Sequence, residues 1–252
     1  MRVDVFSVCK HLSEFLDVPS FDDVCINGLQ VEGTRGISLI ATAVSPSLFA
    51  IEAAAKHGAE LLLTHHGLFL KNSGTPLSGN FSKRVRSLYK EDIHLLSYHA
   101  PLDAHPEVGN CWPILKEVGC TSLEPFGRFL NNFVGVKGIC PPIAQKELFE
   151  KLQQIFGAPG VMFGRAKKSI QSIGFVSGGG HRLLGEAIAQ KVDCFITGTT
   201  DEQVWSLAQE EDISVMAFGH YATEKKGIQL LGEHLSKQFQ VAHTFILEKN
   251  PF

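Results

Sequence analysis

Histidine and carboxylate residues recur in this sequence at places where they could bind metal ions. His65 and His66 are adjacent and directly follow the apolar run "LLLT". Two further histidines each precede an acid by four positions: His99 with Asp103, and His220 with Glu224. Imidazole and carboxylate donors without a thiolate suit a borderline divalent metal ion. Because a carboxylate can bridge two ions, a donor set of this size favours two ions, about 3.5–4 Å apart, over one.

Each of these features also has an ordinary structural explanation. A lone histidine after a strand is more often a hydrogen-bonded core or surface residue than a ligand, and a His-His pair is common. The combination of the pair with two His-x-x-x-carboxylate units favours metal binding. The turn "SGGGH" at 177–181 could present backbone N–H groups to a phosphate or could be only a tight turn, and both interpretations remain open.

The donors stand at the ends of predicted strands. Apolar runs such as "ISLIATAV" (37–44), "AELLLT" and "IHLLSYH" (93–99) alternate with amphipathic stretches, and "SIGFVSGGG", "VDCFIT" and "ISVMAFGH" repeat the pattern later. This alternation predicts an α/β fold with mostly parallel sheets. Ligands bind beyond the carboxyl ends of parallel strands, so the fold is expected to bring these side chains together.

A weak internal repeat predicts two similar α/β domains. "GAELLLTHHG" and "KVDCFITGTT" both end a strand at a threonine, and laying "IHLLSYHAPLD" over "ISVMAFGHYATE" places His99 on His220 and Asp103 on Glu224. The Pro- and Gly-rich segment 120–130 is the most favourable boundary. We therefore predict domains at 1–127 and 128–252, with the end of the chain able to pack back on the first.

Composition excludes several classes of protein. The formal net charge of -3 over 252 residues argues against a nucleic-acid-binding surface. The sequence has no apolar run of about 18 residues, so no membrane span is expected. The N-terminal stretch lacks the apolar region of a signal peptide. Six cysteines without C-x-x-C spacing predict thiols in a reducing, cytoplasmic location rather than a zinc ribbon or a disulfide framework.

Five motifs together resemble a known family. "NGLQVEG", "LLLTHHGLF", "YHAPLDAHPEVGN", "FITG" and "GHYATEKKG" occur in this order, over a stretch from about Val24 to Leu247. The set is similar to the Nif-three-like family, known in bacteria as GTP cyclohydrolase 1 type 2 homologues, in its short form. One departure is "TGTTDEQ", which lacks the acid that often follows "TG" and puts in doubt any substrate role of that loop.

The resemblance implies two similar α/β domains with a dinuclear metal site between them, in a toroidal homohexamer. It assigns the ligands by motif: His66 and Asp103 to one ion, His65 and His220 to the other, and Glu224 to both. His99 would lie close by as a substrate contact, so the catalytic roles fall to His99 and Glu224. The metals remain open among zinc, iron, manganese and nickel, because imidazole and carboxylate suit all four.

Two functions are compatible with such a site. The first is a metal-dependent hydrolase that activates water for attack on a small, nucleotide-like substrate, with ring opening of GTP implied by the resemblance. The second is a non-catalytic, metal-dependent binding or regulatory hexamer. Five ligands, one of them shared, leave each ion with three protein ligands and open positions, which favours catalysis over a closed structural site.

Overall fold

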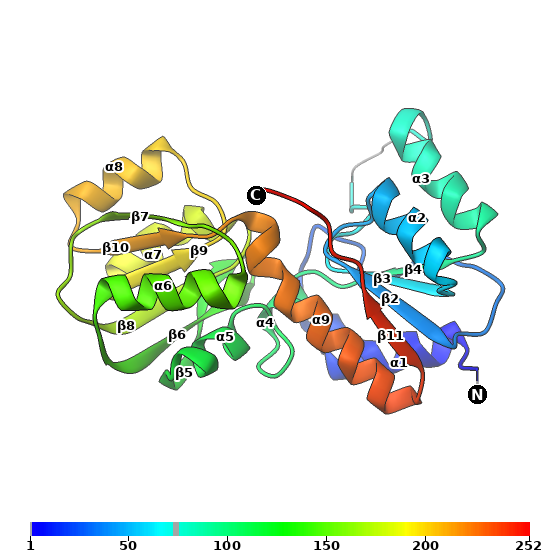
Figure 1. Ribbon diagram of the computed structural model, residues 1–252, viewed down its shortest axis with the longest axis horizontal. Helices are drawn as coiled ribbons and strands as arrows, with labels where there is room; N and C mark the ends of the chain where they lie inside the picture. Colours follow the sequence, from blue (N-terminus) through cyan, green and yellow to red (C-terminus); the bar gives the residue numbers. More distant parts are fainter. Residues whose placement is uncertain (1, 73–75) are drawn as a thin grey trace. The chain divides into compact units, whose positions relative to one another are not determined.

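The computed structural model describes residues 2–72 and 76–252 of the chain, and they form a mixed α/β fold with two sheets (Figure 1). The chain divides into two compact units, and neither is continuous in sequence. Unit 1 comprises residues 1–102 and 227–249, and unit 2 comprises 103–226 and 250–252. These divisions differ from the continuous halves 1–127 and 128–252, which remain a prediction from sequence.

Unit 1 contains a five-stranded sheet in the order β1-β4-β3-β2-β11. The strands are β1 (Gly28–Val31), β2 (Leu39–Ala43), β3 (Leu61–Thr64), β4 (His94–Ser97) and β11 (Ala242–Phe245). All neighbours are parallel except β1, which runs antiparallel to β4. β3 and β4 are buried at every position, as expected for parallel strands covered on both faces.

The helices of unit 1 differ in how clearly their ends are capped. They are α1 (Val5–Phe15), α2 (Leu48–His57) and α3 (Gly79–Lys90), together with the parts of α4 (Ala100–Ala104) and α9 (His220–Phe239) that belong to this unit. Ser47 caps α2 by accepting a hydrogen bond from the Ala50 N–H, and Gly58 ends it in the left-handed conformation with φ 76°. These signals explain why α2 stops where the chain must turn into β3.

Unit 2 contains a six-stranded sheet in the order β5-β6-β8-β9-β10-β7. The strands are β5 (Thr121–Phe129), β6 (Asn132–Ile143), β7 (Val161–Gly164), β8 (Ile170–Val176), β9 (Cys194–Thr197) and β10 (Ser214–Ala217). Only β8, β9 and β10 run parallel, and the other three pairings are antiparallel. The prediction of mostly parallel sheets is therefore confirmed for unit 1 and wrong for unit 2.

The segment 120–130 accounts for one of these antiparallel pairings. Its proline and glycine content suggested a boundary between domains, but it forms β5, which a two-residue connection joins to β6 as an antiparallel hairpin. Pro125 is compatible with this role because β5 is an edge strand, where one side of the backbone has no partner strand. A short hairpin connection can only produce antiparallel neighbours, whereas parallel strands need a crossover.

The helices of unit 2 are α5 (Trp112–Val118), α6 (Gln145–Phe156), α7 (Leu184–Ala189) and α8 (Glu202–Glu210), with a 3-10 turn, η2 (Gly180–Leu183), before α7. Gly119 and Gly157 end α5 and α6 in the left-handed conformation. Asp201 caps α8 by accepting from the Val204 N–H. In the part of the chain that the structure describes, no helix is both long and apolar enough to span a membrane.

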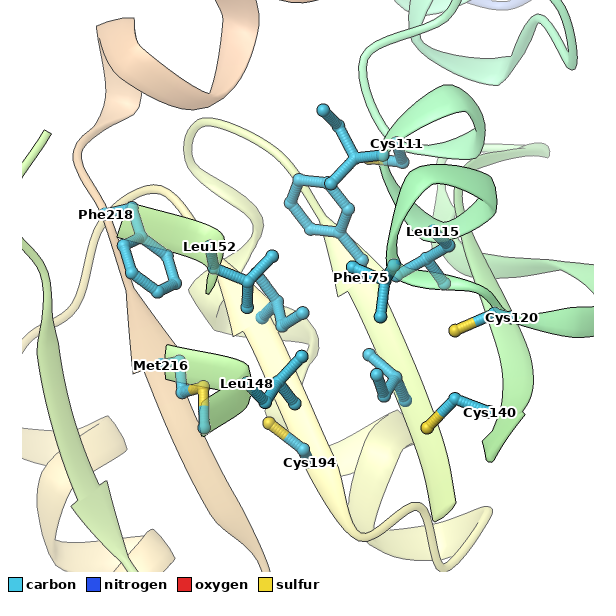
Figure 2. Packing of buried hydrophobic residues seen from close by; sticks show 14 of the residues in the cluster. Cys111, Leu115, Cys120, Cys140, Leu148, Leu152, Phe175, Cys194, Met216 and Phe218 are labelled. Carbon is cyan, nitrogen blue, oxygen red and sulfur yellow. The ribbon is translucent and has the colours of Figure 1, made fainter. Parts of the chain in front are cut away.

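Each unit has its own apolar core. The core of unit 1 includes Ile51 of α2, Leu62 of β3 and Leu95 of β4. The core of unit 2 includes Phe175, Met216 and Phe218, together with four of the six cysteines: Cys111, Cys120, Cys140 and Cys194 (Figure 2). All six cysteines are in the thiol form, as the sequence predicts.

Candidate metal centre

Three histidines of unit 1 lie together beyond the carboxyl ends of β3 and β4. His65 and His66 directly follow β3, and His99 follows β4 with one residue, Tyr98, between them. Each offers a ring nitrogen, and these three nitrogens lie within 4.8 Å of one another. Nitrogen ligands at 2.0–2.1 Å from a tetrahedral ion are about 3.3 Å apart, so small side-chain rotations would bring the three into ligating positions. The predicted grouping of these histidines at one sheet edge is therefore observed.

The Nδ1 atom of each histidine has a hydrogen-bonding partner. That of His65 lies 3.2 Å from the Tyr98 carbonyl oxygen, and that of His66 lies 2.8 Å from the Ser45 hydroxyl oxygen. A carbonyl can only accept, so the His65 Nδ1 carries the proton and its Nε2 keeps the lone pair that a metal needs. The Ser45 hydroxyl can select the same tautomer in His66 by accepting. Metal-binding histidines are typically fixed in this way.

Asp23 fixes His99 by the same principle. Its Oδ1 accepts a hydrogen bond from the His99 Nδ1 at 2.8 Å, and its Oδ2 accepts from the Ala100 N–H at 2.9 Å. Burial acts to raise the pKa of the Asp23 carboxyl, but the hydrogen bond and charge of His99, together with hydrogen bonds from Asn27 and the Cys25 N–H, lower it well below its usual range. Asp23 is therefore an ionised carboxylate that orients His99.

The motif "NGLQ" holds the loops that carry these histidines. Asn27 accepts from the His99 N–H at 2.8 Å and donates to Asp23 at 2.9 Å. Gln30 accepts from the N–H groups of Leu68 and Phe69, at 2.7 and 2.9 Å, just after the histidine pair. The sequence patterns gave no indication of these roles for Asp23, Asn27 and Gln30. No local pattern could reveal Asp23, because it is 76 residues from His99 in sequence.

The first turn of α9 carries two of the donors of unit 2. The Nε2 of His220 lies 3.3 Å from Oε2 of Glu224, four residues later on the same helix face. This separation equals that of two donors bound to one tetrahedral ion, about 3.3 Å. The predicted helical spacing of this pair is therefore correct. The Glu224 side chain is 5% exposed, whereas that of His220 is 38% exposed.

Two glycine-containing turns make room for Glu224. Gly178 has φ +52°, and a Cβ at this position would overlap Glu224 Oε1 and come within 3.0 Å of His220 Nε2. A Cβ on Gly198 would lie 2.6 Å from both the Gly178 carbonyl oxygen and the Thr223 Oγ1. Only glycine permits this close approach, so the "SGGGH" turn serves to place the carboxylate.

The same turn does not provide a ready phosphate cradle. The Gly178 N–H donates to Thr223 Oγ1 at 3.0 Å, and the Gly180 N–H donates to the Ser177 carbonyl at 3.0 Å. These two amides are thus used inside unit 2. His181, at the end of the turn, pairs through Nδ1 with Thr199 Oγ1 at 2.7 Å and lies 3.5 Å through Nε2 from Asp201.

Asp103 is held by neighbours within unit 2. Its Oδ1 accepts from the Asn110 side chain at 2.7 Å and from the Ser177 hydroxyl at 3.2 Å. The residue is 7% exposed. Hydrogen bonds from neutral donors leave the negative charge in place, so Asp103 remains suited to a cation. Ser177 precedes Gly178, so one turn contributes to the environment of both Asp103 and Glu224.

Comparison with known proteins places the chain in a family. The model of the Duf34/NIF3 (NGG1p interacting factor 3) family matches residues 3–251. The chain belongs to this family. Among Duf34/NIF3 relatives, a protein of Chlamydia pneumoniae is 40% identical over 253 residues, covering 99% of this chain and 100% of its own. One of Pseudomonas aeruginosa is 34% identical over 254 residues, covering 100% of both. Both are named GTP cyclohydrolase 1 type 2 homolog.

Solved structures support the same Duf34/NIF3 assignment. The protein ybgI, described as of unknown function, is 31% identical with a TM-score of 0.92 over 100% of both chains. TTHA1606 of Thermus thermophilus is 27% identical with a TM-score of 0.91, covering 99% of this chain and 100% of its own. The resemblance inferred from the five motifs is therefore confirmed, and so is the mixed α/β fold with two sheets.

Proposed function

We propose that this protein is a metal-dependent hydrolase acting on a nucleotide-like substrate. The observation that carries the proposal is the arrangement of His65, His66 and His99 in unit 1. Their ring nitrogens gather within 4.8 Å, and an outer hydrogen-bond partner meets each Nδ1. Three neighbouring imidazoles, each with a hydrogen-bond partner at Nδ1, are the arrangement expected of a set of metal ligands.

The proposed ligand set follows the assignment that the family motifs imply: His66 and Asp103 would hold one divalent ion, His65 and His220 would hold a second, and Glu224 would be shared. The donor chemistry supports this set, because all five are imidazoles or carboxylates and no cysteine is among them. Zinc, iron, manganese and nickel are each compatible with such donors. Three protein ligands per ion leave positions open for water and substrate.

The bound ions would supply hydroxide near neutral pH by lowering the pKa of water toward about 7. The residues of the chain bind the substrate, orient it and move protons. His99 suits proton transfer at Nε2, because Asp23 holds its Nδ1–H and a neutral imidazole can accept a proton near neutral pH. Glu224 has one oxygen beside His220 and the other against the Gly178 turn, which restricts its carboxylate to one orientation.

The names of the relatives suggest the substrate class. In GTP, the corresponding reaction adds water to the carbon of the guanine imidazole ring and opens that ring. Two amides of the 177–181 turn, those of Gly178 and Gly180, are already hydrogen-bonded within unit 2 and are not available to the triphosphate. We further propose a cytoplasmic location, which the six thiols support, and assembly as a toroidal homohexamer, which rests on the family resemblance alone.

The first experiment measures metal. Protein purified without added metal and then saturated with zinc or manganese should carry about two ions per chain. Glu224→Ala should lower this number, whereas Glu233→Ala, which removes an exposed glutamate from the same helix, should not. Fewer than one ion per chain in the wild-type protein at saturation would rule out the proposed centre.

The second experiment measures turnover. Wild type, Glu224→Ala and Glu233→Ala, each loaded with metal, are incubated with GTP, other nucleoside triphosphates and phosphodiesters. Hydrolysis by wild type and Glu233→Ala, but not by Glu224→Ala, is the expected result. Full metal occupancy without turnover of any compound would replace the hydrolase with the non-catalytic, metal-dependent binding protein.

A further inference from the structure

Two buried thiols of unit 2, those of Cys120 and Cys140, do not belong to the proposed set of metal ligands. Cys120 directly precedes β5 and Cys140 lies in β6, and these strands are antiparallel. Thr121 pairs with Ile139, so the same register one residue further places Cys120 opposite Cys140. The Cys140 thiol donates to the Ile170 carbonyl oxygen at 3.6 Å, and Figure 2 shows the side chains of both cysteines in the unit 2 core.

This arrangement matches the geometry of a disulfide. Residues directly opposite each other in an antiparallel pair have Cα atoms about 4.5–5.5 Å apart. Disulfide-bonded cysteines have Cα atoms about 4.4–6.8 Å apart. Bond formation therefore requires side-chain rotation and no rearrangement of the hairpin. Gly138 allows Cys120 to pack closely against β6, since a Cβ on Gly138 would lie 3.2 Å from the Cys120 Cβ.

The surroundings of the two thiols set the rate of their oxidation and the size of the oxidant that can reach them. Burial raises the pKa of both thiols, to about 12 for Cys120, so the reaction is slow. Cys120 is 6% exposed and Cys140 is 4% exposed, so only a small oxidant reaches them.

We propose that Cys120 and Cys140 are a modification site that forms a reversible disulfide on exposure to hydrogen peroxide. The Cys140 thiolate attacks one peroxide oxygen, the O–O bond breaks, and a sulfenic acid and water result once the leaving hydroxide is protonated. The Cys120 sulfur then attacks the sulfenic sulfur and displaces its oxygen as a second water. Two thiols lose two electrons and two protons, and one peroxide becomes two waters.

Peptide mapping can test this pairing without ambiguity. Trypsin cleaves after lysine and arginine, so Cys120 falls in peptide 117–128 and Cys140 in peptide 138–146. The other four cysteines fall in four further peptides: 3–10, 11–35, 91–116 and 192–225. Folded protein is exposed to peroxide, its remaining thiols are alkylated, and the digest is analysed by mass spectrometry before and after treatment with dithiothreitol.

The expected product is peptide 117–128 joined to 138–146, lighter by two hydrogen atoms than the two separate peptides and released by dithiothreitol. Cys194→Ala should still form it, because this nearby thiol is not in the pair. Cys140→Ala should not. The proposal is overturned if both peptides keep their thiols after Cys9, the least buried cysteine, is fully oxidised. A link from either peptide to 192–225 would overturn it as well, and the wild-type map decides even if a variant fails to fold.

Discussion

In unit 1 the segment β2-α2-β3-α3-β4 places three parallel strands side by side, and in unit 2 the segment β8-α7-β9-α8-β10 does the same. One acid before the middle strand plays the same part in both. Glu60 accepts from the N–H groups of Ser38 and Leu39, and Asp193 accepts from those of Gln171 and Ser172. The frame that positions the strands is thus shared in its details.

The chemistry beyond the carboxyl ends of these strands differs. Unit 1 places two histidines after its middle strand and a third after the next, and the Tyr98 carbonyl and the Asp23 carboxylate orient two of their rings. In unit 2 the middle strand is followed by Gly198, and two of the donors come from the first turn of α9. The same arrangement of three parallel strands can therefore position ligands in two ways. Unit 1 orients its histidines with hydrogen-bond partners, and unit 2 makes room for Glu224 with a glycine.

The largest expected effect is on metal affinity, when one added methyl group displaces Glu224 in unit 2. In Gly178→Ala the Cβ overlaps Glu224 and the backbone stays at φ +52°, so the carboxylate must move. We expect metal affinity to fall by about 100-fold, the upper end of the range for changes beside a ligand. Titration with zinc, followed calorimetrically, measures it. Gly185→Ala is the matched control, since its Cβ meets nothing within 4 Å; an equal loss in both variants would contradict the steric argument.

The next effect tests how unit 1 holds its histidine loop. Gln30→Ala removes a side chain that accepts from two N–H groups and donates to the carbonyls of Ile26 and Phe69. At roughly 0.5–1.5 kcal/mol for each of these four hydrogen bonds, we expect a loss of about 2–6 kcal/mol in the free energy of unfolding. Urea unfolding measures this loss. Gln171→Ala, at an exposed position in a strand, should change it by less than about 0.5 kcal/mol.

A smaller effect isolates the partner that orients His99. Asp23→Asn keeps the shape of the side chain but removes the charge that holds the Nδ1–H, so metal affinity should fall by roughly 10-fold. Metal titration gives the affinity, and nitrogen NMR of the metal-free protein reports the tautomer of His99. Asp22→Asn, at the exposed neighbouring acid, serves as the control. An unchanged tautomer in Asp23→Asn would remove the role assigned to Asp23.

The smallest effect concerns the shared acid of the two frames. Burial acts to raise the pKa values of Glu60 and Asp193, but hydrogen bonds from two backbone N–H groups and a serine outweigh it and lower both. A lowered pKa in the folded state stabilises the fold above the unfolded-state values of 4.5 and 3.8, and this stability is lost as the pH falls below them.

Urea unfolding between pH 7 and pH 3 tests this equivalence. The free energy of unfolding of wild type should decrease on acidification, and Glu60→Gln and Asp193→Asn should each flatten that decrease by a similar amount. The change is small because a protonated carboxyl can still accept some of these hydrogen bonds. Flattening in only one of the two variants would show that the acids are not equivalent.

Sequence periodicity and donor spacing predicted much of what the structure contains. The parallel strands of unit 1, the placement of His65, His66 and His99 at one sheet edge, and the helical pairing of His220 with Glu224 all depend on neighbours within a few residues or on strand direction. Such local rules are readable because hydrophobic periodicity and four-residue spacing act over one or two turns of chain.

Only the tertiary structure decided the rest. β5 occupies a segment with the composition of a linker, since a proline that would disrupt a central strand is tolerated at a sheet edge. Asp23 and His99 meet across 76 residues of sequence, and the need for glycine at 178 arises from Glu224 on another element. Contacts of this kind follow from packing of distant segments, which no short sequence pattern records.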